Sequence, residues 1–252
     1  MSFPRRICLV LLALAVLFGS SLVGNRAVDA ARKPRPPATT TTTTTTSTSS
    51  TTTTSTLPPG TVAATATDLL GRLTLAVEVG TGYSRTLFTH WIDSDGDGCN
   101  TRYEVLIAES LTTPTVVPPC TLGNTTWFSA YDGITEYLPA DVDIDHVVAL
   151  KEAWDSGAWN WSAERRRAFA NDLGDPRSLI AVTDNVNSAK GDKDPSEWMP
   201  PRAAYHCQYL FDWIAVKVRW SLTIDQLERN AVASMLTSCP ATVLTISVAQ
   251  VT

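Results

Sequence analysis

The threonine and serine tract from Thr39 to Thr56 is the feature that most limits what this 252-residue chain can fold into. With the Pro-rich residues on either side, it makes residues 31–60 a segment with almost nothing to bury in a core. We predict a stalk there, either a plain spacer or one that carries O-linked sugar. The folded part is then residues 61–252, which is long enough for one sizeable domain.

The residues before the stalk are predicted to be an export signal. Arg5 and Arg6 precede an apolar run from Ile7 to Gly24, and the small-residue pattern that ends at Ala30 suits cleavage by signal peptidase. We therefore assign residues 1–30 to a signal peptide. The alternative is an uncleaved membrane anchor, because the run approaches the length that spans a bilayer. Both interpretations place residues 61–252 outside the cell, either secreted or at the cell surface, and only the second gives the chain a stable membrane partner.

The net charge of the exported part limits how it can bind nucleic acid. Six of the 20 Lys and Arg residues and one of the 25 Asp and Glu residues lie in the first 60 positions, which leaves 14 basic against 24 acidic residues and a net charge near −10. A protein that binds nucleic acid mainly by neutralising phosphates is expected to be basic. Binding by this domain should therefore be weak and salt-sensitive, with a bound cation supplying the local positive charge.

Four cysteines lie in the exported part, namely Cys99, Cys120, Cys207 and Cys239. An even number outside the cell predicts two disulfides, and four cysteines allow three pairings. We favour the local pairing, Cys99 with Cys120 and Cys207 with Cys239. A zinc site is the alternative, although no C-x-x-C or close Cys/His pair supports it.

Hydrophobic periodicity predicts a strand, a long insertion, a second strand and a helix in the middle of the domain. Residues 142–150 are β-branched and alternate like a half-buried strand, and residues 178–183 form a second short apolar strand. Asp184 then looks like the cap of a short helix that stops at Gly191. Other helices are predicted at 65–79, at 162–171 after a Ser162 cap, at 205–220 along an aromatic stripe, and through Thr237 after a capping box of Thr223 and Gln226.

Two of these segments carry residues that suit phosphodiester hydrolysis, which needs a base for water, a cation and ligands for that cation. His146 can be the base, and Asp145 and Asn187 can hold Mg²⁺, for which Mn²⁺ can substitute. Asp145 and His146 would point to opposite faces of a regular strand, so we expect the strand to end or bulge there. Lys190 shares a helix face with Asn187, which would let its ammonium meet a phosphate oxygen.

Together these residues resemble the HNH endonucleases, whose ββα-metal motif carries Asp-His on a first strand and Asn, often as N-x-x-K, on the helix. More closely, the chain is similar to secreted HNH proteins related to the C-terminal nuclease domain of GmrSD-type restriction enzymes. The resemblance covers roughly residues 82–239 and rests on several motifs in order. These are Trp91-x-Asp93-x-Asp95-Gly96-x-Gly98-Cys99-x-Thr101-Arg102, Asp145-His146-Val147-Val148-x-Leu150, Asn171-Asp172, Asn187-x-x-Lys190-Gly191-Asp192 and Trp198-x-Pro200.

Two positions depart from the family pattern. Ser178 stands where the middle Asn of HNH motifs usually precedes the second strand. This replacement puts the rigidity of the strand-connecting loop in doubt but leaves the metal chemistry intact. Ala149 replaces a common Pro, a change that we regard as neutral.

A calcium-loop pattern overlaps the first of these motifs. The spacing D-x-D-x-D-G-x5-E is met by Asp93, Asp95, Asp97, Gly98 and Glu104. Against an EF-hand, Asn100 occupies the position where an apolar residue normally pairs two such loops, and no clear helix precedes the loop. The alternative is a hydrogen-bonded acidic turn that presents Arg102 to the scissile phosphate.

We therefore predict an α+β domain built on a ββα-metal (HNH) core, wrapped by helices and pinned by two disulfides. Its predicted activity is metal-dependent endonucleolytic hydrolysis of nucleic acid, with DNA the favoured partner. His146 would activate water, Asp145 and Asn187 would hold Mg²⁺, and Lys190 and Arg102 would stabilise charge on phosphate. The alternatives are a non-catalytic cell-surface module stabilised by calcium at the Asp93–Glu104 loop, and a degenerate HNH fold that only binds.

Overall fold

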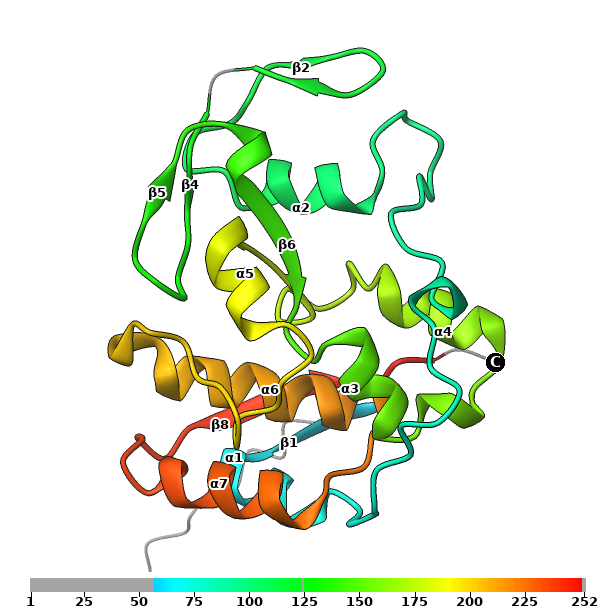
Figure 1. The fold of residues 1–252 in the computed structure, drawn as a ribbon, viewed down its shortest axis with the longest axis vertical. Helices are drawn as coiled ribbons and strands as arrows, with labels where there is room; N and C mark the ends of the chain where they lie inside the picture. The colour runs from blue at the N-terminus through cyan, green and yellow to red at the C-terminus, as the bar shows by residue number, and fades with distance from the viewer. Residues whose placement is uncertain (1–56, 124, 251–252) are drawn as a thin grey trace, which may run out of the picture. The chain divides into compact units, whose positions relative to one another are not determined.

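The computed structural model of the protein describes residues 57–123 and 125–250 (Figure 1). The predicted signal peptide and most of the predicted stalk lie outside these residues. Across the described ranges, no helix combines the length and the apolar character needed to cross a membrane.

The described part of the chain is a mixture of helices and short strands, as predicted. The strands are β1 (Thr61–Thr65), β2 (Val116–Val117), β3 (Thr121–Leu122), β4 (Trp127–Phe128), β5 (Thr135–Glu136), β6 (Val142–His146), β7 (Leu179–Thr183) and β8 (Val243–Ser247). The α-helices are α1 (Ala66–Arg72), α2 (Thr101–Ala108), α3 (Leu150–Asp155), α4 (Ala163–Ala170), α5 (Asp184–Lys190), α6 (His206–Trp220) and α7 (Gln226–Leu236). The 3₁₀ helices are η1 (Arg85–Leu87), η2 (Pro139–Asp141), η3 (Ala158–Asn160) and η4 (Ala203–Tyr205).

The strands form four antiparallel pairs: β1 with β8, β2 with β3, β4 with β5, and β6 with β7. The β1–β8 pair joins the two ends of the described chain, with Thr61 opposite Ser247. The β6–β7 pair carries two of the predicted site residues, with Asp145 opposite Ile180 and His146 opposite Leu179.

Helix α5 follows β7 directly and contacts both strands of the β6–β7 pair, which gives a strand–strand–helix unit near the middle of Figure 1. The face of β6 that carries Val142 and Ile144 is buried against Leu106 of α2 and Trp127 of β4. Because side chains alternate along a strand, Val142 and Ile144 both point into this apolar core. The polar residues Asp145 and His146 follow at the end of β6.

Helix α6 contributes residues to two large clusters of buried apolar side chains, one on each side of the helix. Its predicted aromatic stripe is confirmed as core, since Tyr209, Trp213 and Trp220 are each at most 2 % exposed and pack in the cluster that also contains Val147 and Val148. The opposite side of α6 packs against α1, α7 and β8 through a second apolar cluster.

Three sequence-based boundaries need correction. The helix predicted over 65–79 ends at Arg72, because Leu75 forms a parallel bridge with Ile224 and tertiary backbone bonds replace helical ones. The strand predicted over 142–150 ends at His146, and α3 begins at Leu150. The cap of α7 is Asp225, whose carboxylate accepts from Leu227 N and Glu228 N, and not Thr223.

Both predicted disulfides are confirmed. Cys99–Cys120 ties the start of α2 to the β2–β3 hairpin, and Cys207–Cys239 ties the first turn of α6 to the residues after α7.

Candidate active site

The end of β6 brings the predicted catalytic residues to one place. The strand ends at His146, as expected, and Asp145 and His146 both line a cavity of about 210 Å³. Asn187 of α5 lines the same cavity. Three of the five residues predicted for catalysis and metal binding therefore converge on one cavity, while Lys190 and Arg102 do not line it.

Asp145 is buried and held at both carboxylate oxygens. Lys190 Nζ donates to Oδ1 at 2.8 Å, and the Tyr131 hydroxyl donates to Oδ2 at 2.8 Å. Burial raises the pKa of Asp145, and the neighbouring ammonium of Lys190 and the hydroxyl of Tyr131 act against that rise. The carboxylate is thus fixed in orientation, and each oxygen keeps a lone pair for a further ligand.

His146 is 5 % exposed. Its ring centroid lies 5.5 Å from that of Trp91 and 6.3 Å from that of Phe169, and it stacks on both rings. Its Nε2 lies 2.9 Å from the carbonyl oxygen of Ala170. A carbonyl can only accept, so Nε2 carries the proton of the neutral ring and Nδ1 carries the lone pair. Burial lowers the pKa of His146 to about 3, with the positive charge of Arg85 also acting in that direction.

Trp91 adopts a positive φ of 58°, which is uncommon for a residue other than glycine. Its loop is held by Asn171, whose Oδ1 accepts from Ile92 N at 3.1 Å and whose Nδ2 donates to Thr89 O at 2.8 Å. These bonds keep the indole of Trp91 against the imidazole of His146. Asn171 therefore helps to position His146 through Trp91, a role that the motif by itself did not indicate.

Asn187 is oriented by Asp143, since its Nδ2 donates to Asp143 Oδ2 at 3.0 Å. The amide oxygen of Asn187 then remains as a donor atom for a cation. A carboxylate and an amide oxygen around a small polar cavity are donors that a hard divalent cation such as Mg²⁺ prefers, with water completing the coordination. The donor set of Asp145 and Asn187 therefore fits the metal that the sequence predicts.

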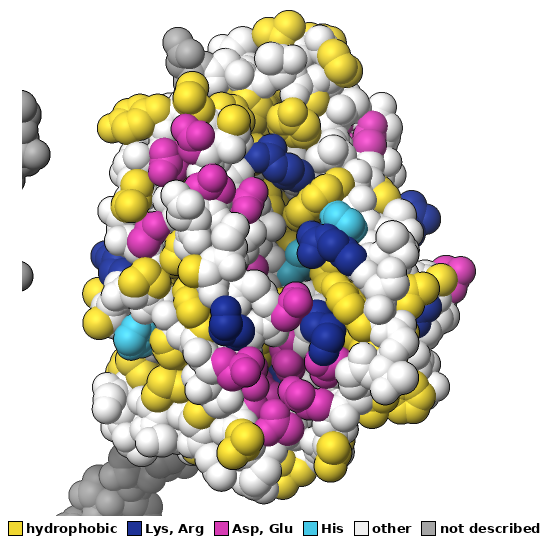
Figure 2. Space-filling model, viewed as in Figure 1, with side chains coloured by type: hydrophobic (Ala, Val, Ile, Leu, Met, Phe, Trp, Pro, Cys, Tyr) yellow, Lys and Arg dark blue, Asp and Glu magenta, His cyan; other side chains and the backbone are white. Residues whose placement is uncertain are grey.

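Two further charged residues line the cavity, Arg85 of η1 and Asp192 after α5. Both side chains are exposed. In Figure 2 histidine side chains lie in a hollow beside Lys and Arg side chains, with acidic side chains gathered below them. Asp192 belongs to one of the family motifs, but the sequence predicted no role for it. Arg85 was missed altogether, because no spacing rule links it to the strand and helix motifs.

Lys190 and Arg102 are placed differently from the sequence-based expectation. The Lys190 side chain is fully buried, and its Nζ donates to Asp145 Oδ1 and, at 3.0 Å, to His146 O. Arg102 donates through one nitrogen to Pro139 O and Val142 O, both at 2.7 Å, and so anchors the start of β6. Neither arrangement presents the charge to a phosphate in the cavity.

The loop before β7 is held although Ser178 replaces the usual Asn. The Ser178 hydroxyl donates to Asp172 Oδ2 at 2.7 Å, and Ser178 O accepts from Val147 N at 3.1 Å. Asp172 also receives two bonds from the Arg219 guanidinium and one from Trp220 Nε1. This buried network supplies the rigidity that the Ser178 replacement put in doubt.

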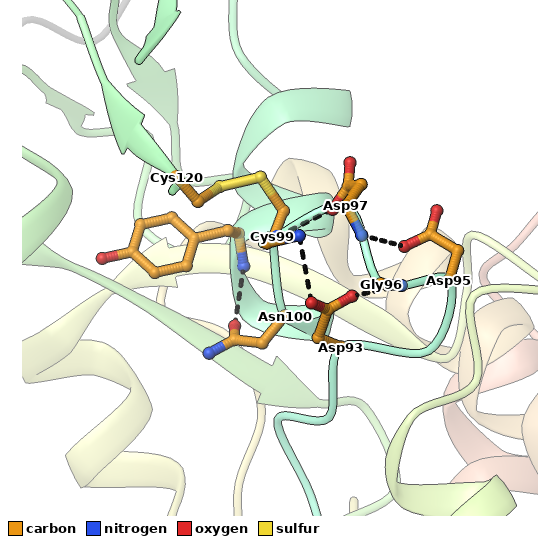
Figure 3. Close-up of a disulfide and its surroundings, with 9 residues drawn as sticks. Asp93, Asp95, Gly96, Asp97, Cys99, Asn100 and Cys120 are labelled. Atoms are coloured by element: carbon orange, nitrogen blue, oxygen red, sulfur yellow. Dashed lines mark hydrogen bonds between the residues drawn. A yellow bond between two sulfur atoms is a disulfide. The ribbon is translucent and has the colours of Figure 1, made fainter. Parts of the chain in front are cut away.

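The acidic loop before α2 is closed by its own backbone (Figure 3). Asp93 accepts from Gly96 N at 2.8 Å and from Gly98 N at 3.0 Å, and Asp97 accepts from Cys99 N at 2.7 Å. Asp93, Asp95 and Asp97 each offer an oxygen within 4.8 Å of the others, whereas Glu104 groups only with Asp97 and Cys99 among the described residues. This geometry supports a hydrogen-bonded turn, and calcium binding by the loop remains a prediction.

The chain is similar to known proteins over most of this region. The family described as "GmrSD restriction endonucleases, C-terminal domain" matches residues 101–235. A protein of Arthroderma benhamiae named "Uncharacterized secreted protein" is 48% identical over 178 residues, which cover 70% of this chain and 86% of that protein. No solved structure matches the chain.

Proposed function

Because the chain belongs to the family of GmrSD restriction endonuclease C-terminal domains, we propose that it is an exported, metal-dependent endonuclease that hydrolyses phosphodiester bonds, with DNA as substrate. We further propose that β6, β7 and α5 are its ββα-metal core. One observation carries the proposal: Asp145, His146 and Asn187, supplied by a strand and a helix, line one small cavity. The match to a protein named as secreted supports export.

In the proposed reaction His146 is the general base. Its Nε2–H is held by Ala170 O, which leaves Nδ1 to accept a proton from the attacking water. The water oxygen bonds to phosphorus, the bond from phosphorus to the leaving sugar oxygen breaks, and that oxygen takes a proton from solvent. A pKa of about 3 makes a weak base, and the negative charge of a phosphate beside the ring would raise that pKa toward a useful range.

Asp145 and Asn187 are the residues that would hold Mg²⁺, which when bound would stabilise charge on the phosphate and the leaving oxygen. Tyr131 and Lys190 position Asp145 through the two 2.8 Å bonds to its carboxylate. Arg85 takes the phosphate-binding role that the sequence assigned to Arg102 and Lys190, because it is exposed and, among the described residues, is the Lys or Arg that lines the cavity.

The test is cleavage of supercoiled plasmid, single-stranded DNA and RNA by the purified protein with Mg²⁺, Mn²⁺ or EDTA. We expect nicking that needs the metal and that falls 10²- to 10⁴-fold in His146→Gln, the usual range for loss of a general base. His206→Gln is the matched control, because His206 bonds a backbone carbonyl, Pro200 O, and does not line the cavity.

Two other outcomes would replace the proposal. Retention of DNA without cleavage under every metal would identify a degenerate HNH fold that only binds. Absence of cleavage and binding, together with a calcium-dependent rise in melting temperature that Asp95→Asn abolishes, would identify the module stabilised by the Asp93–Glu104 loop.

A further inference from the structure

Tyr83 lies two residues before Arg85, in the segment that leads into η1. Ser84 between them has an extended backbone, with φ −144° and ψ 132°. Side chains two positions apart in an extended segment point to the same side of the backbone. Because Arg85 lines the active-site cavity, the side chain of Tyr83 is directed toward the same region. The sequence predicted no role for Tyr83.

The ring of Tyr83 is held by neighbouring side chains. Its centroid lies 6.1 Å from that of Trp154 and 6.3 Å from that of Phe88, and both of these residues are buried. Lys151 Nζ lies 5.9 Å from the centroid of the Tyr83 ring. Tyr83 itself is half-buried. A tyrosine of this kind has a fixed ring and a polar tip that can reach solvent or a ligand.

The hydroxyl of Tyr83 lies near both of the exposed charged residues that line the cavity. Burial raises the pKa of Tyr83, the charge of Asp192 acts in the same direction, and the charge of Arg85 acts against them. These effects agree with the direction that the extended backbone at Ser84 gives the side chain. A guanidinium can only donate hydrogen bonds, so Arg85 leaves the hydroxyl proton of Tyr83 available to another acceptor.

An in-line displacement determines where the leaving oxygen lies. The attacking water is beside His146, which at 5 % exposure is at the inner end of the cavity. The leaving oxygen is on the opposite side of phosphorus, toward the mouth, where the exposed Arg85 and Asp192 lie. The cavity, of about 210 Å³, is smaller than the roughly 300–1,000 Å³ that encloses a whole small ligand. The leaving sugar would therefore lie outside it, on the side of Tyr83.

We propose that Tyr83 is the general acid of the reaction and protonates the leaving sugar oxygen in place of solvent. This inference rests on the proposed function. The bond from phosphorus to the leaving oxygen breaks with its electron pair on that oxygen, which takes the hydroxyl proton of Tyr83, and the phenolate then takes a proton from solvent. A sugar alkoxide is a stronger base than a phenolate, so the transfer is favourable. The raised pKa keeps the proton on Tyr83 at neutral pH until the bond breaks.

Single-turnover cleavage of two matched oligonucleotides tests this assignment. One is ordinary DNA, and the other carries sulfur in place of the bridging oxygen that leaves, which is identified from the ends of the wild-type products. A thiol has a pKa of about 8.5, so a thiolate leaves without a proton. We expect Tyr83→Phe to cleave ordinary DNA about 10²-fold more slowly than the wild type, and the sulfur substrate at a rate within about threefold of the wild type.

Activity on the sulfur substrate also shows that Tyr83→Phe is folded. Tyr137→Phe is the matched control, because Tyr137 is 69 % exposed and does not line the cavity. An equal loss on both substrates would overturn the proposal and make Tyr83 a positioning residue for Arg85. An unchanged rate on ordinary DNA would also overturn it and leave the proposed function intact. A wild-type protein that cleaves neither substrate would overturn the proposed function, and the role of Tyr83 with it.

Discussion

Replacing Lys190 with Met should destabilise the protein strongly, because it leaves the buried carboxylate of Asp145 without its cation. Lys190 is fully buried and gives two bonds, to Asp145 Oδ1 at 2.8 Å and to His146 O at 3.0 Å. Removing one partner of a buried ion pair costs about 3–5 kcal/mol. For a domain of this size, about 4 kcal/mol corresponds to a fall of about 8–16 °C in the melting temperature.

Urea unfolding followed by tryptophan fluorescence measures this change, with the slope m checked between variants. Lys193→Met is the matched control, since the exposed Lys193 ammonium donates only to backbone carbonyls at the end of α5 and its loss should cost at most about 0.5 kcal/mol. Adding Asp145→Asn to Lys190→Met should recover part of the loss, because the unpaired charge is removed.

A loss below about 1 kcal/mol in Lys190→Met would refute the reasoning, because it would mean that Asp145 carries no charge that needs compensation. The same variant probes the metal. With the ammonium absent, Mg²⁺ should raise the melting temperature of Lys190→Met more than that of the wild type, since Asp145 is a proposed ligand. An equal effect on both proteins would count against Asp145 as a metal ligand.

Three further predictions concern the same cavity. Arg85→Ala should lower kcat/KM on DNA about tenfold with little change in the free energy of unfolding in urea. Arg102→Ala should instead lower the free energy of unfolding by about 1–3 kcal/mol, because Arg102 donates to two backbone carbonyls. The reverse pattern would identify Arg102 as the phosphate-binding residue. Tyr131→Phe should lower kcat more than it raises KM and should weaken Mg²⁺ affinity by freeing Asp145 Oδ2, and unchanged Mg²⁺ affinity would make the bond purely structural. Because the folded pKa of His146, about 3, lies below its unfolded value near 6.5, acid protonates the unfolded chain first and stability falls as the pH drops from about 6.5 toward 3. Between pH 7 and pH 5 the titration of His146 should lower the free energy of unfolding of the wild type, measured in urea, by about 2 kcal/mol. The variant His146→Gln should lack this loss. If the loss persists in that variant, it does not come from a buried neutral ring at His146.

The strand, helix and disulfide pattern of this chain could be predicted because it depends on local signals. Ser162 accepts from Arg165 N at the start of α4, and the aromatic stripe of α6 is buried as its spacing indicates. The errors arose where distant backbone competes with local propensity. Residues 73–79 have helical spacing, but Thr74 O accepts from Ile224 N and Val79 N donates to Asp155 O, which no local pattern can show.

The candidate site shows the same limit at the level of single side chains. The spacing of Asn187 and Lys190 places them on one helix face, and this alone suggests that both meet a substrate. The spacing does not say how deeply each side chain is buried. The Lys190 side chain is buried and its ammonium donates to Asp145, so Lys190 does not line the cavity. Arg85 reaches the cavity from a segment with no motif, because tertiary packing of η1 and not spacing brings it there. Motifs therefore identify which elements meet at a site of this kind, while the assignment of each charge to substrate or to scaffold depends on burial.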